Sequence, residues 1–181
     1  SPSREDVNFG VTFSSRFAHD MGLDPERVLR ATLEDLGVRS VRLPVYWDMV
    51  ELEQGVFDFS DVEWQLDMAR DFGVDVIVAV GRKVPRWPEC HIPRWVPENE
   101  AMRAEAAERF VRETIRRFRH RSEISTWQIE NEPFLAFGIC PPLSTGALER
   151  EIAVAREADP SRPILTTDSG ELSMWIPAAS R

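Results

Sequence analysis

The sequence lacks the features that mark several large classes of protein. Its only cysteines are Cys90 and Cys140, which are too few for a disulfide scaffold and are not spaced like zinc ligands. The longest apolar run, from Val76 to Val80, is far shorter than the roughly 20 residues of a membrane span. We therefore expect no membrane span and no metal site.

Two further absences concern nucleotides and nucleic acids. The sequence contains neither G-x-G-x-x-G nor G-x-x-x-x-G-K-[ST], and only 9 residues are glycine, so it predicts no nucleotide cofactor. The net charge of -9 repels phosphate backbones and argues against nucleic-acid binding. The basic stretch from Arg112 to Arg121 is interpreted as a solvated helix face, because apolar residues interleave with its arginines.

The composition that remains is that of an ordinary globular protein, with 43% hydrophobic and 29% charged residues. Strand and helix patterns alternate along it. The predicted strands are Asn8–Phe13, Ser40–Pro44, Val74–Val80, Ile124–Glu130 and Ile164–Thr167. The predicted helices run from Pro25 to Leu36, from Ser60 to Phe72, from about Glu100 to Arg119 and from Ser144 to Ala158, and a loop and the start of another helix follow residue 167.

Local signals support these boundaries. Asp24 and Pro25 are typical of a helix N-terminus, and Gly37 is typical of a helix C-terminus. Ser60 and Glu63 have the spacing of a capping box. Repeated strand–helix units predict a parallel sheet, for which both an open doubly wound sheet and a partial barrel are possible.

Long loops follow the second, third and fourth strands, whereas the loops before the strands are short. The long loops hold most of the chemically interesting side chains, namely Tyr46, Trp47, Trp87, His91, Trp95 and Glu132. In parallel sheets, functional sites lie at the carboxyl ends of the strands. Aromatic faces and forked hydrogen-bond donors are the mixture that binds carbohydrates.

The end of the fourth strand carries the most specific motif. Asn131-Glu132-Pro133 resembles the Asn-Glu-Pro motif of glycoside hydrolase clan A, the retaining (β/α)₈-barrel glycosidases. Arg42-Leu43-Pro44, the stretch from Tyr46 to Phe59 and the stretch from Lys83 to Glu89 are similar to β-galactosidase- and cellulase-like members of that clan.

The resemblance implies an α/β fold, a partial TIM barrel with about five βα units. A complete barrel needs roughly 200 to 250 residues, so the 181 residues are expected to form one glycoside-hydrolase-like domain, 1–181, that is incomplete at its C-terminus. The resemblance also implies hydrolysis of β-linked glycosides, oligosaccharides or polysaccharides by double displacement, without a cofactor. Glu132 is the implied general acid/base, and Asn131 the residue that binds the sugar 2-hydroxyl. The implied nucleophile follows a seventh strand and is not in this chain.

Other side chains near the strand ends are candidates for substrate binding, each with a structural alternative. They are Arg42, Trp47, Lys83, Trp87, His91 and Trp95. Arg42 either binds sugar or pairs with Glu130, which is expected to be structural. The tryptophans either contact substrate or belong to the core, and His91 either binds substrate or fastens its loop.

Cys90 and Cys140 lie in the loops after adjacent strands, which are about 4.8 Å apart in a sheet. A disulfide between them is therefore expected, with two free thiols as the alternative. A disulfide favours an extracytoplasmic or secreted location. The chain begins at Ser1 without Met and shows no signal peptide, which is consistent with removal of an upstream segment.

Two alternatives to hydrolysis remain open. The first is a non-catalytic carbohydrate-binding protein on a degraded glycosidase scaffold, and the second is an inactive half-barrel that associates into a full one. Because the first and last strands of a partial barrel have open edges, we also expect self-association. The sugar, and the choice between exo and endo action, are not predicted.

Overall fold

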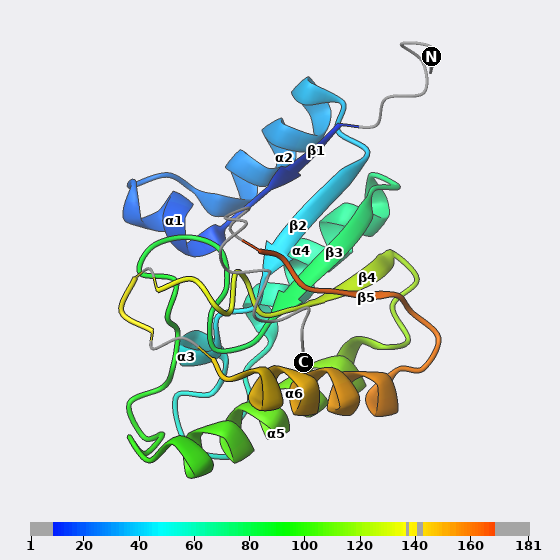
Figure 1. Ribbon diagram of the computed structural model, residues 1–181. Helices are drawn as coiled ribbons and strands as arrows, with labels where there is room; N and C mark the ends of the chain where they lie inside the picture. Colours follow the sequence, from blue (N-terminus) through cyan, green and yellow to red (C-terminus); the bar gives the residue numbers. More distant parts are fainter. Residues whose placement is uncertain (1–8, 137, 141–142, 169–181) are drawn as a thin grey trace.

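The computed structural model of the protein describes residues 9–136, 138–140 and 143–168 (Figure 1). Five parallel strands form one sheet in the order β1-β2-β3-β4-β5. The strands are β1 (Gly10–Thr12), β2 (Ser40–Pro44), β3 (Asp75–Val80), β4 (Ile124–Ile129) and β5 (Ile164–Leu165). Each expected strand is present; the third and fourth are one residue shorter than predicted, and the first and last are shorter by more.

Helices connect the strands and lie on the convex side of the curved sheet (Figure 1). The long helices are α2 (Pro25–Leu36), α4 (Ser60–Asp71), α5 (Glu100–Phe118) and α6 (Thr145–Ala158). Two short helices, α1 (Ser15–Asp20) and α3 (Trp47–Val50), lie in segments where no helix was predicted. The expected loop and helix start at 168–181 lie outside the described residues, apart from residue 168 itself.

The order of the strands decides between the two architectures that the sequence allowed. In a doubly wound sheet the strand order reverses at a switch point, whereas here it follows the chain from β1 to β5. Sequential parallel strands with outer helices are the arrangement of a TIM barrel. The fold is therefore α/β, part of a TIM barrel.

The helix ends follow the sequence signals with one exception. The Asp24 carboxylate accepts hydrogen bonds from the N–H groups of Glu26 and Arg27, and Gly37 ends α2 in the left-handed conformation at φ 57°. The predicted capping box of Ser60 and Glu63 is wrong. Phe59 occupies the N-cap position of α4, and Asp58 instead accepts a hydrogen bond from the N–H of Ser60.

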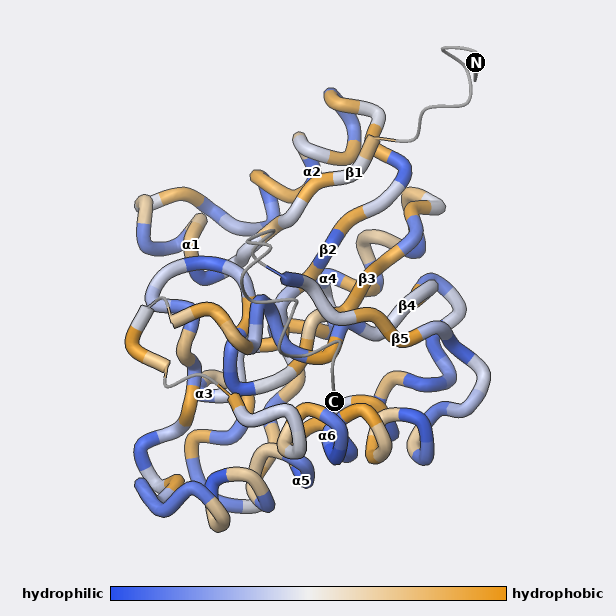
Figure 2. The backbone as a smooth tube through the Cα atoms, viewed as in Figure 1, coloured by the Kyte–Doolittle hydropathy of each residue, from blue (hydrophilic) through white to orange (hydrophobic). Residues whose placement is uncertain are grey.

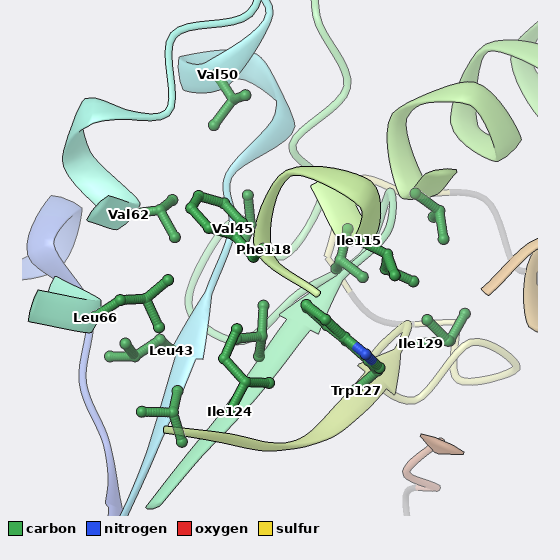
Figure 3. Packing of buried hydrophobic residues seen from close by; sticks show 14 of the residues in the cluster. Leu43, Val45, Val50, Val62, Leu66, Ile115, Phe118, Ile124, Trp127 and Ile129 are labelled. Carbon is green, nitrogen blue, oxygen red and sulfur yellow. The ribbon is translucent and has the colours of Figure 1, made fainter. Parts of the chain in front are cut away.

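The core fills the space between the sheet and its outer helices (Figure 3). Leu43 on β2, and Trp127 and Ile129 on β4, pack there with Leu66 of α4 and Ile115 of α5. Burying each such side chain stabilises the fold by about 1.5–3 kcal/mol. Figure 2 shows β3 as an almost continuous hydrophobic segment, as expected of a parallel strand covered on both faces.

Both edges of the described sheet are open. β1 pairs only with β2, and β5 only with β4, among the residues that the structure describes. Beside β1, a shallow apolar hollow of about 280 Å³ includes Phe17, Met21 and Leu36, which are exposed. Self-association through these edges stays a prediction. No helix in the described part of the chain is long and apolar enough to cross a membrane.

Candidate active site

The candidate site begins where β4 ends, at Ile129. The next three residues, Glu130, Asn131 and Glu132, leave the strand in an unusual conformation, with φ of 60° at Glu130 and 48° at Glu132. Positive φ at a residue other than glycine costs on the order of 1–3 kcal/mol and persists only where surrounding contacts hold it. The side chains of this segment therefore do not alternate as they would in a continuing strand.

The fully buried Glu130 carboxylate supplies one of these contacts. Its Oε1 accepts a hydrogen bond from the N–H of Arg82 and its Oε2 from the N–H of Lys83, both at 2.7 Å. At Gly81 the φ is 151°, and a Cβ there would lie 2.5 Å from the Glu130 carboxylate. Glycine at position 81 thus lets the end of β3 approach the side chain that fixes the end of β4.

The predicted pairing of Glu130 with Arg42 is wrong. Because the backbone turns at Glu130, its carboxylate lies on the helix side of the sheet, near the Arg82 guanidinium. Arg42 donates instead to Thr12 Oγ1 at 2.9 Å and to Gln128 Oε1 at 3.1 Å. Gln128 takes the place that the sequence interpretation gave to Glu130.

Asn131 lies at the centre of a hydrogen-bond cluster at the end of β4. Its Oδ1 accepts from Thr167 Oγ1 at 3.1 Å, from Gln128 Nε2 at 3.3 Å and, more weakly, from Arg42 Nη1 at 3.5 Å. Its own N–H donates to the Lys83 carbonyl at 2.7 Å. Within the described part of the chain no acceptor lies within hydrogen-bonding distance of Nδ2, so this amide group is available to a ligand.

Glu132 has a fixed backbone and a free carboxylate. Its N–H donates to Thr167 Oγ1 at 3.1 Å, and its carbonyl accepts from Lys83 Nζ at 3.0 Å. Among the described residues its side chain makes no hydrogen bond or ion pair. Burial, and then the Arg86 charge, lower the pKa of Arg42, while the nearby Glu132 carboxylate opposes this shift. Glu132 therefore lies within electrostatic range of Arg42.

Lys83 holds the backbone of the segment that carries Glu132. It is only 1% exposed, and its Nζ donates to the carbonyls of Glu132 and Leu135 and lies 3.8 Å from Glu89 Oε2. Burial raises the pKa of Glu89, with Lys83 opposing and Glu132 adding to the shift. The burial of Lys83 contradicts the predicted direct contact with substrate, because no surface of the side chain is left for a ligand.

The three predicted tryptophans lie in different surroundings. Trp47 is fully buried, stacks on Phe110 and donates to Glu51 Oε2 at 2.7 Å, so it belongs to the core and its predicted contact with substrate is wrong. The Trp95 indole donates to the Glu51 carbonyl at 2.8 Å and borders a separate hollow. Trp87 is 67% exposed and keeps the surface that substrate binding requires.

His91 is fully buried, which contradicts its predicted hydrogen bond to substrate and favours the structural alternative. Its Nδ1 lies 2.8 Å from Arg16 Nη1, and its ring packs against Tyr46 with the ring centres 4.5 Å apart. Burial alone would raise the pKa of Asp48, but the neighbouring His91 and Arg16 outweigh it and lower that pKa. The histidine fastens the loop after β3 to α1 and α3.

Cys90 and Cys140 are joined in a disulfide, with the two sulfurs 2.02 Å apart and a sequence separation of 50. The bond links the loops that follow β3 and β4. It therefore restrains the rim next to Glu132. No group of three or more side chains that could hold a metal ion occurs in the described ranges.

Sequence reasoning missed three residues of the Asn131 cluster, namely Thr12, Gln128 and Thr167. Gln128 is a polar residue between Trp127 and Ile129 near the end of a predicted strand, which is a signal that the sequence offered, and the structure shows that it is buried. Thr167 is two residues beyond β5, at the same edge of the sheet as Glu132. Thr12 ends β1 and carries no sequence signal beyond that position.

A buried charge cluster lies beneath the site. The Arg82 Nε lies 4.0 Å from Glu130 Oε1 and 3.6 Å from Glu151 Oε1, and its Nη1 donates to Glu100 at 2.9 Å. Burial, together with repulsion from the Glu130 carboxylate, raises the pKa of Glu151 well above its usual range. Burial also raises the pKa of Glu130, but the Arg82 charge and the N–H groups of Arg82 and Lys83 oppose that shift, so Glu151 is the group of the pair that keeps its proton.

Comparisons with known proteins find likeness in structure but not in sequence. The sequence matches no protein-family model, and a search of curated proteins finds no match. A GH5_18 glycoside hydrolase from Streptomyces cattleya in complex with GlcNAc has a TM-score of 0.70 and 18% identity over 89% of this chain. A psychrophilic glycoside hydrolase family 10 endo-β-1,4-xylanase has a TM-score of 0.62 and 16% identity over 91% of it. An exo-β-1,4-mannosidase from Opitutaceae bacterium strain TAV5 has a TM-score of 0.69 and 15% identity over 90% of it.

This chain spans only part of each of these structures, namely 44% of the first, 54% of the second and 32% of the third. At such identities the likeness concerns the fold. The chain is similar to part of the barrel of TIM-barrel glycoside hydrolases, and the predicted resemblance to (β/α)₈ glycosidases is confirmed at that level.

The protonated Glu151 generates a prediction about pH and stability. A carboxyl whose folded pKa is raised contributes its full stability below the usual value of 4.5, and loses it as pH rises through the raised folded value. Between these limits the free energy of unfolding falls with pH by up to about 1.4 kcal/mol per unit. Glu151→Gln, which cannot ionise, should flatten this fall in urea unfolding curves measured from about pH 5 to 8.

The exposed Glu149 on the same helix provides the control, since Glu149→Gln should leave the pH profile as in the wild type. Parallel profiles for Glu151→Gln and the wild type would show that Glu151 is ionised in the folded protein and that the assignment of the proton is wrong.

The disulfide generates a second prediction. Intact mass should not change on alkylation without reductant, and should gain two alkyl groups after reduction. In the loop-closure model, a bond across 50 residues stabilises the fold by about 4 kcal/mol. Two alkylated thiols under non-reducing, denaturing conditions would exclude the bond.

Proposed function

We propose that the chain is the N-terminal part of a retaining β-glycoside hydrolase, with Glu132 as its general acid/base. One observation carries this proposal: the Glu132 carboxylate and the Nδ2 of Asn131, which have no hydrogen-bond partner among the described residues, belong to adjacent residues at the carboxyl end of the fourth strand of a barrel-like sheet. The fold likeness to a xylanase, to a mannosidase and to a hydrolase that binds GlcNAc supports carbohydrate as the substrate class.

The contacts around Asn131 suit the binding of a sugar hydroxyl. Three donors already occupy Oδ1, which fixes the orientation of the amide and directs Nδ2 away from them. Nδ2 then donates to the 2-hydroxyl of the sugar, while Arg42 holds the amide in place. A hydrogen bond to this hydroxyl strengthens in the transition state and contributes to the rate.

Glu132 would act twice in the reaction. Its carboxyl proton passes to the glycosidic oxygen as the bond to the anomeric carbon breaks, and a second carboxylate forms a bond to that carbon. The Glu132 carboxylate then takes a proton from the water that displaces the second carboxylate. The backbone contacts with Lys83 and Thr167 keep Glu132 in position for both steps.

The second carboxylate is expected from beyond β5. In a retaining enzyme it lies about 5–5.5 Å from the acid/base, across the mouth of the barrel. The resemblance to clan A places it after a seventh strand, so a further part of the barrel would supply it.

The test is the hydrolysis of aryl β-glycosides with good and poor leaving groups by the complete barrel that contains this chain and the second carboxylate, and by its Glu132→Gln variant. A poor leaving group needs the proton, so a phenyl glycoside should lose about 10²–10⁴-fold in kcat/KM, which reports the first step, in the variant. A 2,4-dinitrophenyl glycoside needs little protonation in that step and should lose much less in kcat/KM. Glu157→Gln, at an exposed position of α6, is the matched control.

Equal losses for both leaving groups, or no loss at all, would contradict the assignment of Glu132 as the acid. Sugar binding without turnover, unaffected by Glu132→Gln, would instead favour the non-catalytic carbohydrate-binding protein.

A further inference from the structure

A hollow of about 550 Å³ lies between the loop after α3, the loop before α5 and α5 itself. Trp95 contributes to its lining from the loop before α5, Gln54 from the loop after α3, and Glu105, Arg109 and Arg112 from α5. None of its lining residues comes from β4 or from the segment that carries Glu132. The hollow is therefore separate from the candidate active site, and its volume is within the roughly 300–1,000 Å³ of small-ligand sites.

The aromatic wall of this hollow is fixed in place before any ligand arrives. The Trp95 indole N–H donates to the Glu51 carbonyl, and its ring meets Trp47 edge to face with the ring centres 6.0 Å apart. The Arg109 guanidinium lies over the Trp95 ring at 5.3 Å and donates to Glu51 Oε1 at 2.5 Å. Buried Glu51 thus holds both the indole and the guanidinium.

Three polar side chains on the rim of the hollow have no polar partner among the described residues. Gln54, Glu105 and Arg112 line the hollow, and within the described part of the chain they make no hydrogen bond or ion pair. Glu105 and Arg112 are seven residues apart on α5, which places them on the same face of the helix. In addition, the buried Arg109 Nε has no acceptor among the described residues.

The charges around the hollow balance. Arg109 pairs with Glu51, and Glu108 pairs with Arg150, which leaves one carboxylate at Glu105 and one guanidinium at Arg112. On a chain with a net charge of -9, such a site offers no excess of positive charge to an anion. An aromatic face with unused donors and acceptors around it is suited to a neutral, hydroxyl-rich ligand.

We propose that this hollow, here called the Trp95 hollow, binds a segment of a neutral oligosaccharide or polysaccharide. Sugar C–H faces would pack against Trp95, and sugar hydroxyls would exchange hydrogen bonds with Gln54, Glu105 and Arg112. The proposal goes beyond the function proposed for Glu132, because its ligand class follows from the lining of this hollow alone. A polymer held here would be kept at high local concentration near the rest of the chain.

The test is affinity electrophoresis of the whole chain in gels that contain neutral glucomannan, arabinoxylan or mixed-linkage β-glucan, with acidic polygalacturonate as a further probe. At least one neutral polymer should retard the wild type. The Gln54→Ala/Arg112→Ala double variant should lose at least about tenfold in affinity, equal to about 1.4 kcal/mol. Arg116→Ala, at an exposed position one turn further along α5, should bind like the wild type.

A second readout locates the ligand. The indole N–H signal of Trp95, assigned with Trp95→Phe, should shift in NMR spectra on addition of an oligosaccharide from the retarding polymer. Glu132→Gln should keep both the retardation and this shift, so a failure of the proposed hydrolysis would not change either result.

Three outcomes would overturn the proposal. They are no retardation by any neutral polymer, equal retardation of the double variant and the wild type, and retardation by polygalacturonate alone.

Discussion

The position of the candidate catalytic segment depends on one buried carboxylate. The Glu130 carboxylate accepts hydrogen bonds from the N–H groups of Arg82 and Lys83. These bonds connect the end of β4 to the end of β3. A buried carboxylate without partners would be strongly unfavourable, whereas one that accepts two N–H hydrogen bonds and faces Arg82 is satisfied. Gly81 makes this approach possible, because a Cβ there would collide with the carboxylate. The two positive φ angles at Glu130 and Glu132 persist because these contacts hold the turn.

From this support the side chains divide into two groups with different roles. Lys83, His91 and Trp47 are buried, so they hold the loops and expose no surface to a ligand. The Glu132 carboxylate and the Nδ2 of Asn131 have no hydrogen-bond partner among the described residues and lie at the carboxyl end of the sheet. A site that must bind and react needs both kinds of residue, because a free carboxylate is useful only when its backbone is fixed.

Much of this arrangement could be predicted from sequence, and the misses have physical causes. The strands, the long helices and the place of Glu132 followed from apolar periodicity, from Asp24 and Gly37 at helix ends, and from the Asn-Glu-Pro motif. The pairing of Glu130 with Arg42 failed because strand alternation does not apply once φ becomes positive. The choice between substrate contact and a structural role stayed open for Lys83 and His91 because sequence does not show how deeply a post-strand loop folds back onto the sheet.

The Glu130 carboxylate holds the two strand ends together, and amide hydrogen exchange in Glu130→Gln provides the sharpest test of this role. In glutamine one of the two carboxylate oxygens becomes an NH₂ donor, which cannot accept a hydrogen bond from the N–H group that faces that oxygen. We expect exchange at Arg82 or Lys83 to become at least about tenfold faster than in Glu157→Gln, with smaller changes in the middle of β2. Unchanged protection of both amides in Glu130→Gln would show that the carboxylate does not hold the strand ends.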